Sequence, residues 1–169
     1  MGEKKTALLQ CVSILLADFI ICGFIGWVYE TVLTSIIFGR FVERGILAVP
    51  ILPIYGLFAL VLPLIYKKEQ NPVFIAVTGA LGTTVFELIA AYVTEAIWHE
   101  RLWSYADWKF NFFDGRISLF SSLIFGVMCV VFVKWVHPFM LWLKERFGRW
   151  FDISVFVITI SLIVIEVML

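Results

Sequence analysis

Five carboxylates lie inside long apolar stretches of this sequence and are the side chains best suited to chemistry there. They are Asp18, Glu30, Glu87, Glu95 and Glu166. A charged side chain near the centre of a bilayer costs about 2.5–3.5 kcal/mol on insertion scales, so such residues usually face a protein interior and have a partner. The count predicts an enclosed polar site rather than a surface that faces lipid.

Glu87 and Glu30 are the strongest candidates for that site. At about 100° per residue, one polar face of a helix would carry Thr84, Glu87, Ala91, Thr94 and Glu95. Another helix face would carry Gly23, Trp27, Glu30 and Thr34, where a glycine lets a second helix approach. The alternative for Glu87 is a neutral, hydrogen-bonded carboxyl that only fixes helix packing.

The other acidic residues have simpler interpretations. Asp18 lies nearer a helix end, where it can meet water or a lysine. Asp152 and Glu166 lie near the two ends of the last apolar stretch, where we expect water to solvate them.

The elements that must position these side chains are membrane-spanning helices. Hydrophobic residues make up 62% of the 169 residues and charged ones 15%, with a mean hydropathy of +1.00. Soluble domains carry about 45–50% apolar and about 25% charged residues, and a spanning helix needs about 20 apolar residues. We predict one all-α, polytopic transmembrane domain over residues 1–169, with a short amphipathic helix at the interface near residues 137–150. Its five spans are 8–38, 46–66, 73–98, 117–136 and 151–169.

The second predicted span is irregular at its start. Pro50 and Pro53 lie three residues apart, just before Tyr55 and Gly56. Prolines remove backbone donors, and broken helices at membrane depth often form substrate sites in transporters. Alternatively, the prolines lie in the first turn of a helix, where they cost little.

The loop before the fourth span combines aromatic, amide and basic side chains. It contains Arg101, Trp103, Tyr105, Asn111 and Arg116. Its aromatic residues also fit a plain belt at the membrane interface. The two arginines are expected to pair with Glu95 or to hold an anionic headgroup.

Several classes of function are not indicated. Thirteen basic residues balance thirteen acidic ones, so nothing suggests nucleic acid as a partner. No phosphate-binding loop, nucleophile motif or Cys/His cluster occurs, so we predict no catalytic residue, no metal and no cofactor. Lysines and arginines near the helix ends number eight on one side and five on the other, which favours a cytoplasmic N-terminus.

Several motifs occur in one order: Gly26-Trp27-Val28-Tyr29-Glu30, Arg44-Gly45, Pro50, Pro53-Ile54-Tyr55-Gly56, Leu102-Trp103-Ser104-Tyr105 and Gly115-Arg116. Together with Glu87, Glu95 and Asn111, they resemble the bacterial ABC-transporter permease family called type IV or CmpB-like. The resemblance covers about residues 23–126. Glu43 and Ser104 depart from the asparagine and aspartate usual there, which weakens any strict role for a carboxylate in that loop.

The resemblance implies a permease in the bacterial cell membrane, with an ATPase supplied by another chain. The residues matching its motifs or facing the predicted site form the candidate substrate site: Trp27, Glu30, Arg44, Pro50, Pro53, Tyr55, Glu87, Glu95, Arg101, Trp103, Tyr105, Asn111 and Arg116.

The function we expect is a transport component with a polar intramembrane site. Five helices are few for a complete transporter, so we expect a homo-oligomer or a partner membrane or ATPase subunit, within membrane lipid. Carboxylates favour a cationic or proton-coupled substrate. The alternatives are a membrane-embedded enzyme acting on a lipid or isoprenoid phosphate, and a non-transporting assembly or interaction protein.

Overall fold

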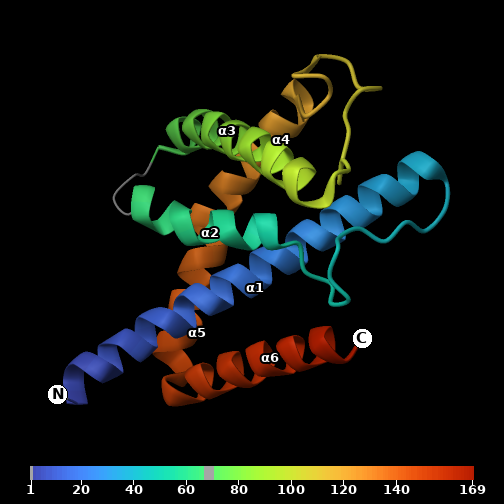
Figure 1. Cartoon of the computed structure of the whole chain (residues 1–169). Helices are drawn as coiled ribbons and strands as arrows, with labels where there is room; N and C mark the ends of the chain where they lie inside the picture. The colour runs from blue at the N-terminus through green and yellow to red at the C-terminus, as the bar shows by residue number, and fades with distance from the viewer. Residues whose placement is uncertain (1, 67–70) are drawn as a thin grey trace. The chain divides into compact units, whose positions relative to one another are not determined.

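The computed structural model describes residues 2–66 and 71–169, and these residues are mostly helical. Its elements are α1 (Gly2–Phe38), α2 (Pro53–Ile65), α3 (Pro72–Trp98), β1 (Asn111–Phe112), β2 (Ile117–Ser118), α4 (Leu119–Val131), the π-helical turn η1 (Phe132–Val136), α5 (His137–Phe147) and α6 (Arg149–Met168) (Figure 1). The predicted all-α class is confirmed. Most of the predicted connection at 67–72 lies outside the described residues.

Within the described part of the chain, four stretches are long and apolar enough to cross a bilayer: Leu9–Phe38, Pro72–Trp98, Leu119–Phe147 and Arg149–Met168. Their apolar side chains largely face outward, as for Ile36 at 73% and Leu81 at 66% exposed. A soluble protein rarely exposes apolar patches on this scale. The chain is therefore a multi-pass membrane protein.

The chain divides into two compact units, which are described separately. The first comprises Met1–Leu64 and Trp135–Leu169, and the second comprises Ile65–Lys134. The first unit thus holds α1, nearly all of α2, α5 and α6. The second holds α3, the β1–β2 hairpin and α4.

In the first unit, the first turn of α2 lies close against α1. A Cβ on Gly26 would lie 2.3 Å from the Tyr55 ring, and one on Gly56 would lie 2.6 Å from the Phe19 ring. These glycines therefore allow the two helices to approach as closely as they do.

The irregular stretch before α2 is buried against α1. The Leu52 N–H donates to the carbonyl of Gly23 at 3.0 Å, and Val49, Ile51 and Leu52 are all buried. Helix α2 begins at Pro53, at the first helical position, where a missing N–H costs little. Irregular backbone at membrane depth is stable only when protein or water satisfies it, and here α1 contributes.

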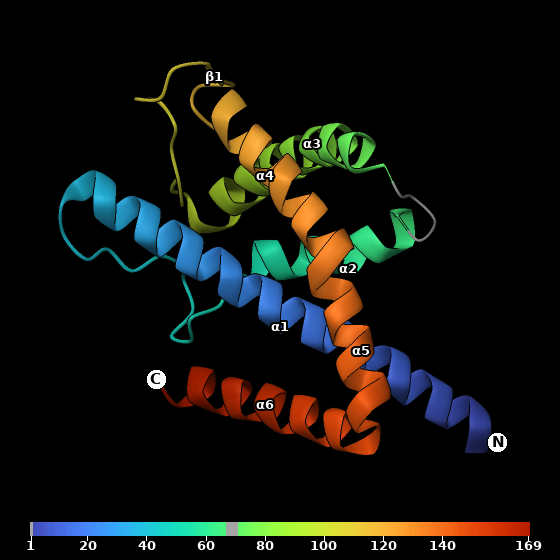
Figure 2. The same ribbon diagram turned by 180° about the vertical axis from the view of Figure 1, so that it is seen from behind.

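Helix α6 runs beside the first part of α1, as Figures 1 and 2 both show. A core between them contains Ala17 of α1, Met140 of α5, and Phe151 and Val155 of α6. Ser13 of α1 bonds Asp152 near the start of α6. Further along both helices, Phe19 and Ile20 of α1 line one cavity with Ile163 and Glu166 of α6. Helices α1 and α6 therefore run in the same direction.

In the second unit, α3 and α4 pack antiparallel through small residues. A Cβ on Gly79 would lie 2.8 Å from Cys129, and one on Gly126 would lie 2.6 Å from the carbonyl oxygen of Ala76. Gly82 does not belong to this contact, because no described atom lies within 4 Å of a Cβ placed there.

Residues 137–147, predicted to belong to a separate amphipathic helix at the interface, form α5, which continues α4 through η1 within one apolar stretch, Leu119–Phe147. That α5 lies at the interface stays a prediction. Pro138 lies in the first turn of α5 and lacks an N–H. A π-helical turn lets the preceding backbone adjust to a proline without ending the helix. Helix α5 ends at Gly148, whose φ of +52° reverses the chain into α6.

Candidate functional site

In the first unit, two other predicted site residues, Tyr55 and Arg44, contact Glu30. The Tyr55 hydroxyl donates to Glu30 Oε1 at 2.9 Å, and Arg44 Nε lies 3.3 Å from Glu30 Oε2. The Arg44 backbone N–H also donates to the Thr31 hydroxyl. Roughly a quarter of each charged side chain is exposed, so the ion pair lies at an accessible edge of the unit.

The remaining predicted residues of this unit stack against a neighbouring ring or shape the backbone around α2. Trp27 stacks against Phe24 with ring centroids 6.2 Å apart. Pro53 begins α2 and so places Tyr55 in its first turn, facing Glu30. Pro50 lies in the irregular stretch, where the Ile51 N–H donates to the Val49 carbonyl at 2.7 Å.

In the second unit, Glu87 is buried between α3 and α4, with 4% of the residue exposed. Its Oε1 accepts from the Tyr105 hydroxyl at 2.7 Å, and its Oε2 accepts from the Ser121 hydroxyl at 3.5 Å. One turn away, Thr84 donates to Ser122 at 2.6 Å. The predicted polar face of α3 thus meets a hydroxyl-rich face of α4.

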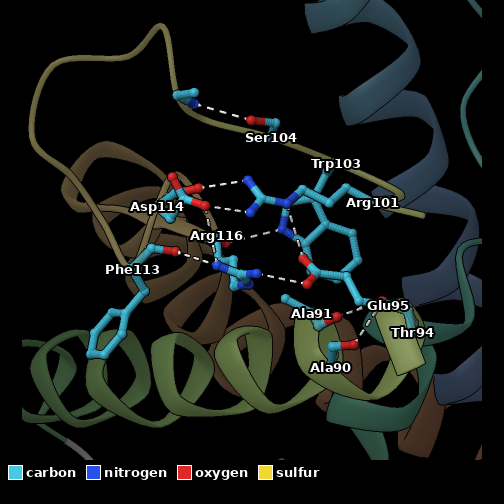
Figure 3. Close-up of polar contacts among 11 residues, drawn as sticks. Ala90, Ala91, Thr94, Glu95, Arg101, Trp103, Ser104, Phe113, Asp114 and Arg116 are labelled. Atoms are coloured by element: carbon cyan, nitrogen blue, oxygen red, sulfur yellow. Dashed lines mark hydrogen bonds and ion pairs between the residues drawn. The ribbon is translucent and has the colours of Figure 1, made fainter. Parts of the chain in front are cut away.

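Ion pairs between two arginines and two acids hold the loop between α3 and α4 in place (Figure 3). Arg116 Nη2 lies 2.7 Å from Glu95 Oε2, and Arg101 Nε lies 3.3 Å from Glu95 Oε1. Arg101 Nη2 also lies 2.5 Å from Asp114 Oδ2. We call Glu95, Arg101, Asp114 and Arg116 the arginine clamp. The arginines thus pair with Glu95, as one of the two predictions proposed.

The ion pairs of the clamp shift the pKa values of Asp114 and Arg116. A hydrogen bond from Arg101, together with its charge, lowers the pKa of Asp114 below its usual 3.8. A hydrogen bond to Glu95 raises the pKa of Arg116 above its ordinary value. Both groups therefore stay charged at neutral pH, and their charges balance within the loop.

Trp103 and Asn111 shape this loop rather than face Glu87. The Trp103 indole N–H donates to the Arg116 carbonyl at 3.1 Å (Figure 3). The Asn111 amide donates to the carbonyls of Ala106 and Trp108 at 3.2 and 2.8 Å. Gly115, at φ +77°, lies where a Cβ would meet Ala106 N at 2.7 Å.

These bonds bear on the alternative of a metal-dependent lipid enzyme. That alternative needed Glu87, Glu95, Asn111 and Arg116 to hold a cation and a phosphate. Both amide hydrogen bonds from Asn111 go to backbone carbonyls, and Glu95 is bonded by two arginines. Over residues 2–66 and 71–169, no three His, Cys, Asp or Glu side chains gather as a metal site.

Three acidic residues expected to meet water instead have protein partners. Asp18 is fully buried and bonds His137. Asp152 accepts from Ser13 and pairs with Lys144. Glu166 accepts from the backbone N–H groups of Ala48 and Val49 at 2.8 and 3.3 Å. Each main partner lies more than 100 residues away in sequence, except Lys144, so residue spacing carried no signal of these contacts.

Glu30 belongs to the first unit and Glu87 to the second. The structure therefore describes two carboxylate sites, each built from its own helices. That both face one cavity stays a prediction.

The comparisons with known proteins bear on the whole chain. No curated protein and no solved structure matched it. One family model matched, over residues 17–169. That range includes every predicted site residue and both carboxylate sites. The chain therefore belongs to the family described as "Putative ABC-transporter type IV".

Proposed function

We propose that the chain is a permease-like membrane subunit of a transporter and that the buried carboxylate of Glu87 is its substrate-binding group. The observation behind this proposal is the position of Glu87 inside a span, 4% exposed and bonded by two hydroxyls. Glu30 and Glu95 each contact an arginine at the edges of their units. The membrane-spanning helices and the family support the broader transport role.

The chemistry of Glu87 suggests a class of substrate. An intramembrane carboxylate is costly and is usually kept for ion or proton pathways. Hydroxyl donors such as Tyr105 and Ser121 orient a carboxylate without cancelling its charge. We therefore propose a small cationic substrate or a proton-coupled one.

The arginine clamp holds the loop that contacts this site. It ties the loop to the end of α3 through Glu95, and the same loop carries Tyr105, which donates to Glu87. A loop that both covers a site and contacts its carboxylate can open and close with occupancy. We propose this movement as the access step on the side where the loop lies.

A partner subunit is part of the proposal. Residues 2–66 and 71–169 hold four helices long enough to span a membrane and one short apolar helix, which is few for a complete transporter. In an ABC-type system, ATP hydrolysis would come from a separate ATPase chain. We propose that the chain works in the cell membrane of a bacterium with itself or with such a partner.

The test replaces Glu87 by Gln, which keeps the shape and removes the charge. Membrane vesicles from cells expressing the chain are incubated with radiolabelled rubidium, choline or spermidine in the outside medium. We expect at least one cation to accumulate above the level of empty vesicles. Glu87→Gln should lower that uptake at least about tenfold, because charged hydrogen bonds contribute about 1.5–3 kcal/mol.

Glu100→Gln is the matched control. Glu100 is exposed in the same loop region and lies outside the clamp, so its loss should leave uptake unchanged. Uptake that survives in Glu87→Gln, or falls equally in both variants, contradicts the role proposed for Glu87.

A further inference from the structure

A second buried acid lies in the first unit, apart from both carboxylate sites. Asp18 of α1 is 0% exposed, and its Oδ2 lies 2.6 Å from Nδ1 of His137 in α5. Its other oxygen, Oδ1, is a buried atom with no hydrogen-bond partner among the described residues. The His137 side chain is 22% exposed, so the imidazole, through Oδ2, connects the buried carboxyl group of Asp18 to the outside of the unit.

The proton count of the pair has two accessible levels. With the hydrogen on Nδ1 and the carboxylate ionised, the pair carries one negative charge. One more proton, on Nε2 of the ring or on Oδ1 of Asp18, makes the pair neutral overall. A lone negative charge is poorly tolerated in a low-dielectric interior, whereas a neutral, hydrogen-bonded pair is tolerated better.

The surroundings of the pair are apolar. Ala17 precedes Asp18 on α1, and Met140 lies one turn after His137 on α5; both belong to the buried core of this unit. Neither of these side chains can supply the hydrogen bond that Oδ1 lacks.

The charged groups on the neighbouring elements are mostly paired with each other. Lys144 of α5 and Asp152 of α6 form an ion pair, which Ser13 of α1 joins. Cys22 lies one turn further along α1, and Lys134 precedes His137 by three residues in the chain. The ion pair balances its own charge and leaves Asp18 to its imidazole partner.

We propose that Asp18 and His137 form a proton-binding site inside the membrane, which takes up and releases one proton as a unit. The ligand is the proton itself. Its route is the half-buried imidazole, and the carboxyl group of Asp18, reached through Oδ2, is the buried end of that route. The site is independent of the substrate role proposed for Glu87.

The test observes the imidazole directly in full-length protein reconstituted in lipid nanodiscs. The sequence has two histidines, so in the His99→Asn variant His137 is the single nitrogen-labelled histidine. Asn suits position 99 because φ there is +57°, a conformation that asparagine tolerates. Nitrogen NMR then follows protonation of both ring nitrogens between about pH 5 and about pH 8, where histidines titrate.

We expect one protonation step at His137, together with the far-downfield proton signal of a short hydrogen bond on Nδ1. Asp18→Asn keeps the size of the side chain but removes the charge, and should abolish both the step within this range and that proton signal. Asp152→Asn removes a carboxylate that bonds Ser13 and Lys144 instead, and should leave both unchanged.

Two results would overturn the proposal. One is a His137 step that is the same whether or not the protein carries Asp18→Asn. The other, in the His99→Asn background, is a ring that keeps one protonation state and an Nδ1 proton signal that stays unchanged across the whole range, because a proton taken up at Oδ1 would alter that hydrogen bond. The second measurement needs no change at Asp18, so it stands even if Asp18→Asn fails to fold.

Discussion

At the scale of single residues, the acids of the second unit differ in what balances their charge. Glu87 accepts from two hydroxyls inside the helix pair. Asp114 is exposed in the loop and takes its partner, Arg101, from the other arm of that loop. The first arrangement orients the carboxyl group by hydroxyl donors, and the second uses an ion pair to hold the loop together.

The first prediction concerns Arg101→Gln. Arg101 is the main cause of the lowered pKa of Asp114, so the change should return that pKa toward its usual 3.8. Carboxyl-carbon NMR of Asp114 measures it directly. Lys109→Gln, an exposed charge in the same loop, is the control and should leave the titration unchanged.

The lowered pKa of Asp114 also determines the direction in which pH changes the stability of the protein. Because the folded-state pKa of Asp114 lies below its unfolded value, its stabilising effect is complete above about pH 4. It is lost as pH falls through the lowered pKa. The thermal midpoints of wild type and Arg101→Gln should therefore converge over that acidic range. Midpoints that stay parallel would show that Asp114 does not contribute through Arg101.

At the scale of helices and loops, the helix pair α3–α4 depends on small residues at defined places. Gly126 of α4 lies where a Cβ would come within 2.6 Å of the Ala76 carbonyl oxygen, a backbone atom that cannot rotate away. Gly82 of α3 faces open space instead. The two glycines therefore form a matched pair for testing the packing of this unit.

We predict that Gly126→Ala destabilises the protein by about 1–3 kcal/mol, the usual cost of overpacking. Gly82→Ala should be neutral or stabilising by up to about 1 kcal/mol, because alanine favours helix over glycine. Unfolding of the purified protein in mixed detergent micelles measures both. Equal losses in the two variants would indicate that α3 and α4 do not pack as described.

Composition and periodicity sufficed to predict the helices, because lipid requires long apolar runs. Charge and proximity in the loop also predicted that arginines pair with Glu95. The contacts of Glu30 with Tyr55 and Arg44 were not predicted. The bonds from Asp18 to His137 and from Glu166 to residues 48–49 depend on how α1, α5 and α6 pack. Tertiary contacts of that kind leave no periodic trace in a single sequence, and neither does the π-helical turn that joins α4 to α5.

At the scale of the whole molecule, the parallel course of α1 and α6 constrains the number of membrane crossings. Four helices that cross in alternation would leave the first and the last antiparallel. A fifth crossing makes them parallel, and α2 is the element that can supply it. Its 13 residues rise about 20 Å at 1.5 Å per residue. The irregular stretch before it adds about 3.3 Å per residue, enough together for a core of about 30 Å.

We therefore predict that the two ends of the chain lie on opposite sides of the membrane, with the N-terminus in the cytoplasm. In a background lacking Cys11, Cys22 and Cys129, single cysteines at Lys4, Lys109 and Met168 are labelled with an impermeant maleimide. Lys4→Cys should react only in inside-out vesicles, and the other two only in right-side-out vesicles, since α3 ends on the side where α6 ends. If positions 4 and 168 react from the same side, the fifth crossing is wrong and α2 is a re-entrant segment. If all three positions exchange sides, the five crossings stand and the excess of eight basic residues over five does not set the orientation.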